Sequence, residues 1–158
     1  MAWPKRGREL RTAILDSTCW NAIALRDGDV VVTTWSKSGT TWVMQIVAQL
    51  LLGAPDGLAV HAGIWPEFTL FPYEPMMAAV EAHSDRRRFF KTHLPVDTLG
   101  IDPSAKYIYV GRDRRDGVWS AYNHQAGFTQ EAIDGMNKVP GRAGGPLLEP
   151  RARLVGYP

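Results

Sequence analysis

The segment from Asp29 to Leu52 most constrains the fold, because its residue pattern changes abruptly near its middle. Three consecutive valines at 30–32 favour a strand that is buried on both faces. The turn-prone residues 36–39 follow, and from Thr40 onward apolar residues recur with helical spacing. This apolar stripe consists of Val43, Ile46, Val47, Leu50 and Leu51. The segment therefore predicts a strand, a tight loop and an amphipathic helix.

A loop of this kind can bind an anion. Its N–H groups and the positive end of the helix dipole point to one place, where phosphate-like groups are held. Lys37 adds a positive charge, and Ser38, Thr40 and Thr41 add hydroxyl donors. The loop is not a Walker A loop of the usual form, because Lys37 precedes Gly39 and no glycine opens the loop.

The composition predicts a soluble globular domain. The 158 residues, 45% hydrophobic and 22% charged, suit one domain over 1–158, with a basic arm at 1–12 and an extended or mobile tail at 138–158. One cysteine allows no intrachain disulfide and argues against a thiol-ligated metal. No apolar run is long enough for a membrane span or a secretory signal, so we expect a cytoplasmic protein without a membrane partner.

The rest of the chain alternates between strand and helix patterns. We expect strands at 89–92 and 107–110 and helices at 20–25, 76–83, 116–124 and 131–137, the first capped by Asp16 or Ser17. Such alternation predicts an α/β fold with a central parallel sheet flanked by helices.

Residues 53–75 hold many prolines and glycines, which predicts an irregular segment. Its aromatic residues either line an apolar acceptor pocket or anchor a long loop. They are Trp65, Phe68, Phe71 and Tyr73. His61 in the same segment is interpreted as a surface or packing residue.

Two further clusters follow expected strands. Lys91 and His93 stand in the string R-F-F-K-T-H-L-P, and Arg112 follows the strand 107–110, with Ser120 about two turns into the next helix. Taken alone, the histidine is more often structural and the arginine more often pairs with an acid. Their occurrence in this order, after the anion-binding loop, favours a functional role for both.

The three clusters resemble the signatures of the cytosolic-type sulfotransferases. K-S-G-T-T-W resembles the loop that holds the 5′-phosphosulfate of 3′-phosphoadenosine 5′-phosphosulfate (PAPS), although Ser36 stands where the family usually has proline. K-T-H-L-P resembles the catalytic histidine segment, and residues 109–122 fit the 3′-phosphate pattern Y-x-x-R-[ND]-x-x-D-x-x-x-S-x-Y. The resemblance implies a fold like that of the P-loop nucleotide hydrolases and sulfuryl transfer from PAPS to a hydroxyl or amine of a small acceptor, without a metal.

The resemblance also implies residue roles. His93 would take the acceptor proton, Lys37 would neutralise the leaving 5′-phosphate, and Lys91 would contact the sulfuryl oxygens. The other implied donor-binding residues are Ser38, Gly39, Thr40 and Thr41 around the 5′-phosphate, Trp42 on the adenine, and Arg112 with Ser120 at the 3′-phosphate.

The family's C-terminal R-K-G segment does not occur after Ser120, so the sequence resembles the N-terminal part of a sulfotransferase. An uncovered sheet edge would then favour self-association into a homo-oligomer.

Two alternatives stay open: a nucleotide-binding remnant without turnover, and a kinase-like nucleotide-binding protein. The expected partner is a small alcohol or phenol. Nucleic acid is not expected, because the basic residues are scattered.

Overall fold

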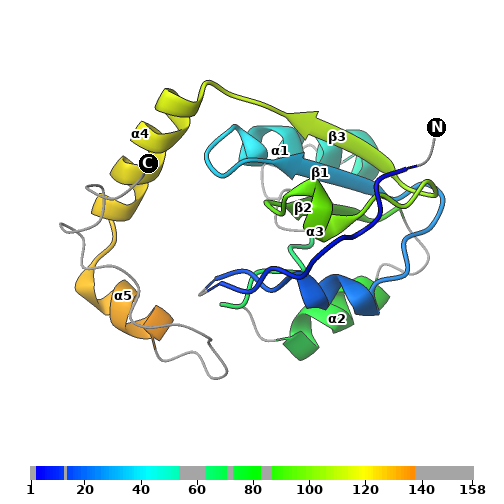
Figure 1. Ribbon diagram of the computed structural model, residues 1–158, viewed down its shortest axis with the longest axis horizontal. Helices are drawn as coiled ribbons and strands as arrows, with labels where there is room; N and C mark the ends of the chain where they lie inside the picture. The colour runs from blue at the N-terminus through cyan, green and yellow to red at the C-terminus, as the bar shows by residue number, and fades with distance from the viewer. Residues whose placement is uncertain (1–2, 13, 54–62, 71–72, 83–86, 138–158) are drawn as a thin grey trace.

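The computed structural model describes residues 3–12, 14–53, 63–70, 73–82 and 87–137 (Figure 1). Its helices are the 3-10 helix η1 (Ser17–Ala22), α1 (Thr40–Leu52), α2 (Tyr73–Ala82), α3 (Val96–Leu99), α4 (Arg114–Ala126) and α5 (Gln130–Asn137). Its strands are β1 (Val30–Thr34), β2 (Phe89–Thr92) and β3 (Lys106–Val110). The predicted tail at 138–158, His61 and Phe71 lie outside the described residues.

The strands form a parallel sheet in the order β2-β1-β3, which confirms the predicted α/β fold. Val30 is in register with Phe89 of β2 on one side and with Lys106 of β3 on the other. The chain therefore passes from the central strand β1 to β2 at one edge and then crosses to β3 at the other edge. In open α/β sheets, ligands bind at such a switch point, beside the carboxyl ends of the strands.

Helices cover both faces of the sheet. Figure 1 shows α1 on one side and η1 with α2 on the other. On the α1 side the buried cluster consists of Val30, Val32 and Phe89 with Met44, Val47 and Ala48. On the other side Val31 and Phe90 pack with Trp20, Ile23, Ile64, Val80, Leu94, Leu99 and Ala105. Burial on both faces explains why β1 begins as an unbroken apolar run and β2 begins with two apolar residues, whereas β3 at the edge is largely exposed.

The predicted apolar stripe of α1 is wrong in part. Ile46 and Leu50 are 51% and 79% exposed, whereas the buried residues of the helix are Met44, Val47 and Ala48. The helix carries apolar side chains on nearly all sides, so spacing alone did not specify which row faces the strands. Contact with β1 and β2 selects the row that begins at Met44.

Several other elements also differ from the sequence prediction; α4, for example, begins at Arg114 and not at 116. The helix predicted at 20–25 is η1, which begins at Ser17 behind an Asp16 cap that accepts a hydrogen bond from Thr18 N–H. Helix α2 starts three residues before the predicted position, because Pro75 is tolerated in a first helical turn. The short helix α3 was not predicted.

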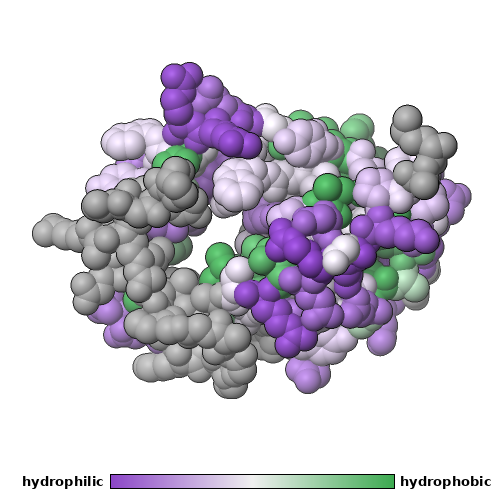
Figure 2. All heavy atoms as spheres, viewed as in Figure 1, coloured by the Kyte–Doolittle hydropathy of each residue, from purple (hydrophilic) through white to green (hydrophobic). Residues whose placement is uncertain are grey.

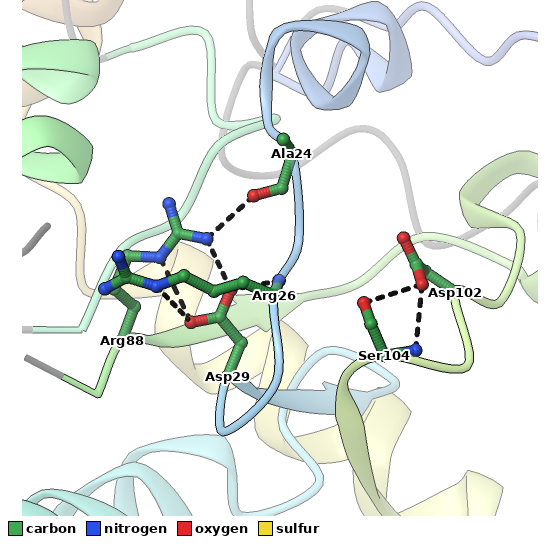
Figure 3. A network of polar contacts seen from close by, with 6 residues as sticks. All are labelled: Ala24, Arg26, Asp29, Arg88, Asp102 and Ser104. Carbon is green, nitrogen blue, oxygen red and sulfur yellow. Dashed lines mark hydrogen bonds and ion pairs between the residues drawn. The ribbon is translucent and has the colours of Figure 1, made fainter.

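A buried ion pair closes the amino end of the sheet (Figure 3). Asp29 is fully buried, and Arg88 donates through Nε and Nη2 to its two carboxylate oxygens. The same Nη2 donates to the carbonyl oxygen of Ala24 at 2.8 Å, and the N–H of Arg26 donates to Asp29 at 3.0 Å. These contacts join β1, β2 and the segment after η1 into one unit.

Candidate active site

The loop after β1 has a strained backbone. Lys37 has a φ of 64°, in the left-handed region that costs a non-glycine residue roughly 1–2 kcal/mol, and Gly39 has a φ of 96°. The N–H of Ser38 donates to the carbonyl of Trp35, which closes the turn. Helix α1 follows with Gly39 as its N-cap, so no cap side chain occupies the N–H groups of its first turn. This backbone can hold an anion between the loop and the helix.

Among the predicted phosphate-binding residues, Ser38 is buried, Thr40 is half-buried and Thr41 is exposed. The Thr40 hydroxyl lies 2.6 Å from the hydroxyl of Thr34 at the end of β1. Trp42 is 78% exposed, so its indole face is accessible beside the loop.

His93 follows β2 and lies against the end of β1. Its Nδ1 is 2.9 Å from the carbonyl oxygen of Thr34 and 3.2 Å from the Thr34 hydroxyl. A carbonyl oxygen only accepts, so Nδ1 carries the hydrogen in this contact. In the neutral ring the lone pair is then on Nε2. Burial lowers the pKa of His93 below its ordinary value, which keeps the ring neutral near pH 7.

Lys91 lies beside His93 on an aromatic support. Its ammonium nitrogen is 4.4 Å from the centre of the Trp65 ring, a cation–π distance. The Trp65 ring also meets the His93 ring edge-on at 5.1 Å and stacks on Phe68 at 4.0 Å. Burial lowers the pKa of Lys91. Within residues 63–70, which we call the aromatic loop, Trp65 therefore contacts both Lys91 and His93.

Glu67 was missed by the sequence interpretation. It lies in the segment predicted to be irregular, its side chain is fully buried, and it contacts the main chain of His93. The sequence feature that could have revealed it is an acidic residue within the apolar string W-P-E-F. A carboxylate buried among apolar residues must accept hydrogen bonds from nearby donors. Thr34 was also missed, since its carbonyl oxygen is a group that every residue has.

Arg112 comes from the end of β3 and reaches the loop after β1. Its Nη1 donates to the carbonyl oxygen of Lys37 at 3.1 Å, and its Nε is 3.8 Å from the exposed Asp116 carboxylate. Asp113 caps α4 by accepting from the N–H of Arg115. Ser120 is half-buried in the second turn of α4, and its place in the site stays a prediction.

The ends of all three strands thus contribute cations to one edge of the sheet. They are Lys37, Lys91 and Arg112. Burial lowers the pKa of His124 in α4, and the nearby positive charge of Lys37 lowers it further. Figure 2 shows the surface hollowed between the part over α4 and the part over the sheet. Such an edge suits an anionic ligand.

The described residues contain no group of three or more His, Cys, Asp or Glu residues placed to hold a metal ion. Every helix in the described ranges is too short or too polar to span a bilayer.

Comparison with known proteins agrees with this geometry. The family described as the sulfotransferase domain matches residues 27–140, which include the end of each strand. The chain belongs to the sulfotransferase family. A glycolipid sulfotransferase of Mycobacterium tuberculosis strain H37Ra is 37% identical over 125 residues, covering 78% of this chain and 38% of that protein. Sulfotransferase 2B1 of Mus musculus is 31% identical over 126 residues, covering 77% of this chain and 35% of that protein.

A comparison with solved structures supports the fold. A crystal structure of retinol dehydratase in complex with retinol and PAP superposes with a TM-score of 0.53 at 22% identity, over 68% of this chain and 42% of that one. The predicted sulfotransferase fold is thereby confirmed. This sulfotransferase chain spans well under half the length of the relatives described above.

Proposed function

We propose that this chain supplies the donor-binding and catalytic residues of a PAPS-dependent sulfotransferase, which transfers a sulfuryl group to a hydroxyl or amine of a small acceptor. The observation that carries the proposal is the tautomer of His93. Because Nδ1 donates to the Thr34 carbonyl, Nε2 is the nitrogen available to accept the acceptor proton. The cations at the same edge supply the charge that the donor requires.

The reaction needs one base and well-placed positive charge. As the acceptor oxygen attacks sulfur, its proton passes to His93 Nε2, a new oxygen–sulfur bond forms, and the bond from sulfur to the phosphate oxygen breaks. Adenosine 3′,5′-bisphosphate leaves with the extra negative charge. Lys37 neutralises that charge, and Lys91 stabilises charge on the sulfuryl oxygens.

The loop residues fit the donor's phosphate groups. The 5′-phosphate is held by Ser38, Gly39, Thr40 and Thr41, where the first helical turn offers N–H groups and the hydroxyls flank them. The exposed Trp42 ring stacks on the adenine. Arg112 and Ser120 hold the 3′-phosphate, and the contact of Arg112 with the Lys37 carbonyl joins the two phosphate sites.

The acceptor we propose is a small alcohol or phenol. Trp65 and Phe68 are stacked with an interplanar angle of 5°, and Trp65 also touches His93, so an apolar wall borders the base. We expect the protein in the cytoplasm, where PAPS is available, and an exposed β3 favours a homo-oligomer. Cell fractionation and light scattering test these two expectations.

The test is transfer of labelled sulfuryl from PAPS to a panel of alcohols and phenols, with His93→Asn as the control. The asparagine amide can still donate to the Thr34 carbonyl but cannot accept a proton. A sulfated product that depends on His93 supports the proposal. Bisphosphate binding without product would support a nucleotide-binding remnant, and magnesium-dependent ATP hydrolysis would support a kinase-like protein.

A further inference from the structure

Glu67 has a set of contacts that packing alone does not require. Its Oε1 accepts hydrogen bonds from the main-chain N–H of His93 and from Nε1 of Trp65, both at 2.9 Å. Its Oε2 accepts from Nε1 of Trp20 at 2.8 Å. One fully buried carboxylate therefore joins the strand end that carries His93 to the aromatic loop.

The donors around Glu67 are neutral, which distinguishes it from Asp29, the other buried acid in the described part of the chain. Asp29 is paired with a guanidinium group, so its charge is cancelled where it lies. A carboxylate accepts and does not donate, and three N–H groups satisfy Glu67 in that role. Burying it still costs free energy that apolar residues of similar size would not cost. A carboxylate retained at this cost points to a role in which its negative charge is used.

We propose that Glu67 is a positioning residue of the sulfuryl transfer: it fixes His93 through its main-chain N–H and fixes Lys91 through the Trp65 ring that supports the ammonium group. This inference rests on the proposed function for its catalytic meaning. The same oxygen atom, Oε1, contacts the main chain of His93 and the ring that supports Lys91. It therefore keeps the base and the cation in a fixed position relative to each other. Small misplacements of reacting groups cost large factors in rate.

The charge of Glu67 acts on the same pair. Among the described residues, the charged groups that act on the His93 ring are Glu67 from the aromatic loop and Lys91 from β2, while β1 offers the uncharged Thr34. Glu67 raises the pKa of His93 against the larger lowering by burial, and it raises the pKa of Lys91 in the same way. The carboxylate thus favours the imidazolium that forms when His93 takes the acceptor proton.

The test compares Glu67→Gln with Trp20→Phe. Glutamine keeps the size but removes the charge and one acceptor, whereas Trp20→Phe removes only the donor on Oε2 and leaves the His93 and Trp65 contacts. We expect Glu67→Gln to lower kcat by about 10²-fold, with the affinity for adenosine 3′,5′-bisphosphate unchanged and with kcat of Trp20→Phe near that of wild type. Equal kcat in Glu67→Gln and Trp20→Phe would overturn the proposal.

A second readout does not depend on turnover. The His93 ring is followed by NMR during a pH titration, with its signal assigned from His93→Asn. Removing the Glu67 charge should lower the pKa of His93 in Glu67→Gln and leave it unchanged in Trp20→Phe. The same pKa in wild type and Glu67→Gln would contradict the proposal. If wild type makes no sulfated product, the proposed function fails while this titration still decides whether Glu67 acts on His93.

Thermal unfolding confirms that each variant is folded before it is compared. If Glu67→Gln does not fold, Trp65→Phe tests the same link, because it keeps a ring but removes the N–H that Oε1 holds. At saturating acceptor its kcat should fall while bisphosphate affinity stays that of wild type. A wild-type kcat in Trp65→Phe would count against the proposal.

Discussion

The charged side chains at the two ends of the parallel sheet differ in whether they have partners of opposite charge. At the amino end, Asp29 and Arg88 are both buried and satisfy each other with short hydrogen bonds. At the carboxyl end, no described carboxylate forms an ion pair with Lys37, and Arg112 has only the exposed Asp116 at 3.8 Å. Strands β1 and β2 thus begin at a neutralised network, whereas the carboxyl end of the sheet presents open positive charge.

The difference indicates which end is built for stability and which for a ligand. Buried charges that have a partner hold strands together, and leaving one without its partner is costly. Cations without a carboxylate at a switch point are available to an anion that arrives from solution. Substitutions of charged groups at the carboxyl end should therefore mainly affect activity, and those at the amino end should mainly affect folding.

The largest effect is expected for the base. His93→Asn should lower kcat for sulfuryl transfer about 10²- to 10⁴-fold, the range for loss of a general base. It should change the free energy of unfolding little, because the amide can keep the hydrogen bond to Thr34. Transfer assays and denaturant unfolding measure the two quantities. A kcat within a few-fold of wild type would exclude His93 as the base.

At the amino end the effect should fall on stability. Asp29→Asn should lower the free energy of unfolding by about 3–5 kcal/mol, because it leaves the Arg88 guanidinium buried without a counter-charge. Asp97→Asn is the control: its pair with Arg8 is about half exposed, and we expect a loss of about 1 kcal/mol or less. Urea unfolding of both variants checks this. Equal losses would show that the buried pair has no special weight.

A smaller effect separates the backbone of the loop from its charge. Lys37→Gly should be more stable than Lys37→Ala by about 1 kcal/mol, since glycine adopts a φ of 64° without strain. Both variants should lose anion affinity, since both lack the ammonium group. Thermal unfolding measures the difference. A less stable glycine variant would mean that the left-handed backbone at 37 is not the strained feature we describe.

The smallest effect concerns pH. Because burial lowers the pKa of His93 and the neutral ring is the base, the acid limb of kcat/KM should have its midpoint below about 6.5, the ordinary value for histidine. The unfolded chain takes up this proton at higher pH than the folded chain. The free energy of unfolding should therefore also fall as the pH drops from about 6.5 to the lower pKa of His93 in the folded chain. A rate profile with a midpoint above 6.5 would contradict this account.

The sequence predicted the sheet more completely than it predicted the helix packing. The valine run at 30–32 and the change to helical spacing at Thr40 located β1, the loop and α1, because both signals are local. Ile46 and Leu50 were misjudged because α1 is apolar on nearly all sides, and only its contact with β1 and β2 selects the buried row.

The proposed site residues differ in how far the sequence points to them. His93, Lys91 and Arg112 could be proposed from the sequence because they stand at or just after strands, in motifs that can be read along the chain. Glu67 could not be, since its partners Trp20 and His93 lie far from it in sequence and meet it only in the folded structure. Local motifs therefore indicate candidate ligand-binding groups, whereas the groups that support them depend on tertiary contacts.

The central claim is that the carboxyl end of the sheet binds a nucleotide carrying both a 5′- and a 3′-phosphate. Calorimetric titration with adenosine 3′,5′-bisphosphate tests it most directly, with Lys37→Ala and Arg112→Ala beside Lys106→Ala, which removes the same charge from the amino end of β3. We predict micromolar affinity, about −8 kcal/mol, weakened in the first two variants and unchanged in the third. No binding by the folded chain, or equal affinity in all three variants, would contradict the claim.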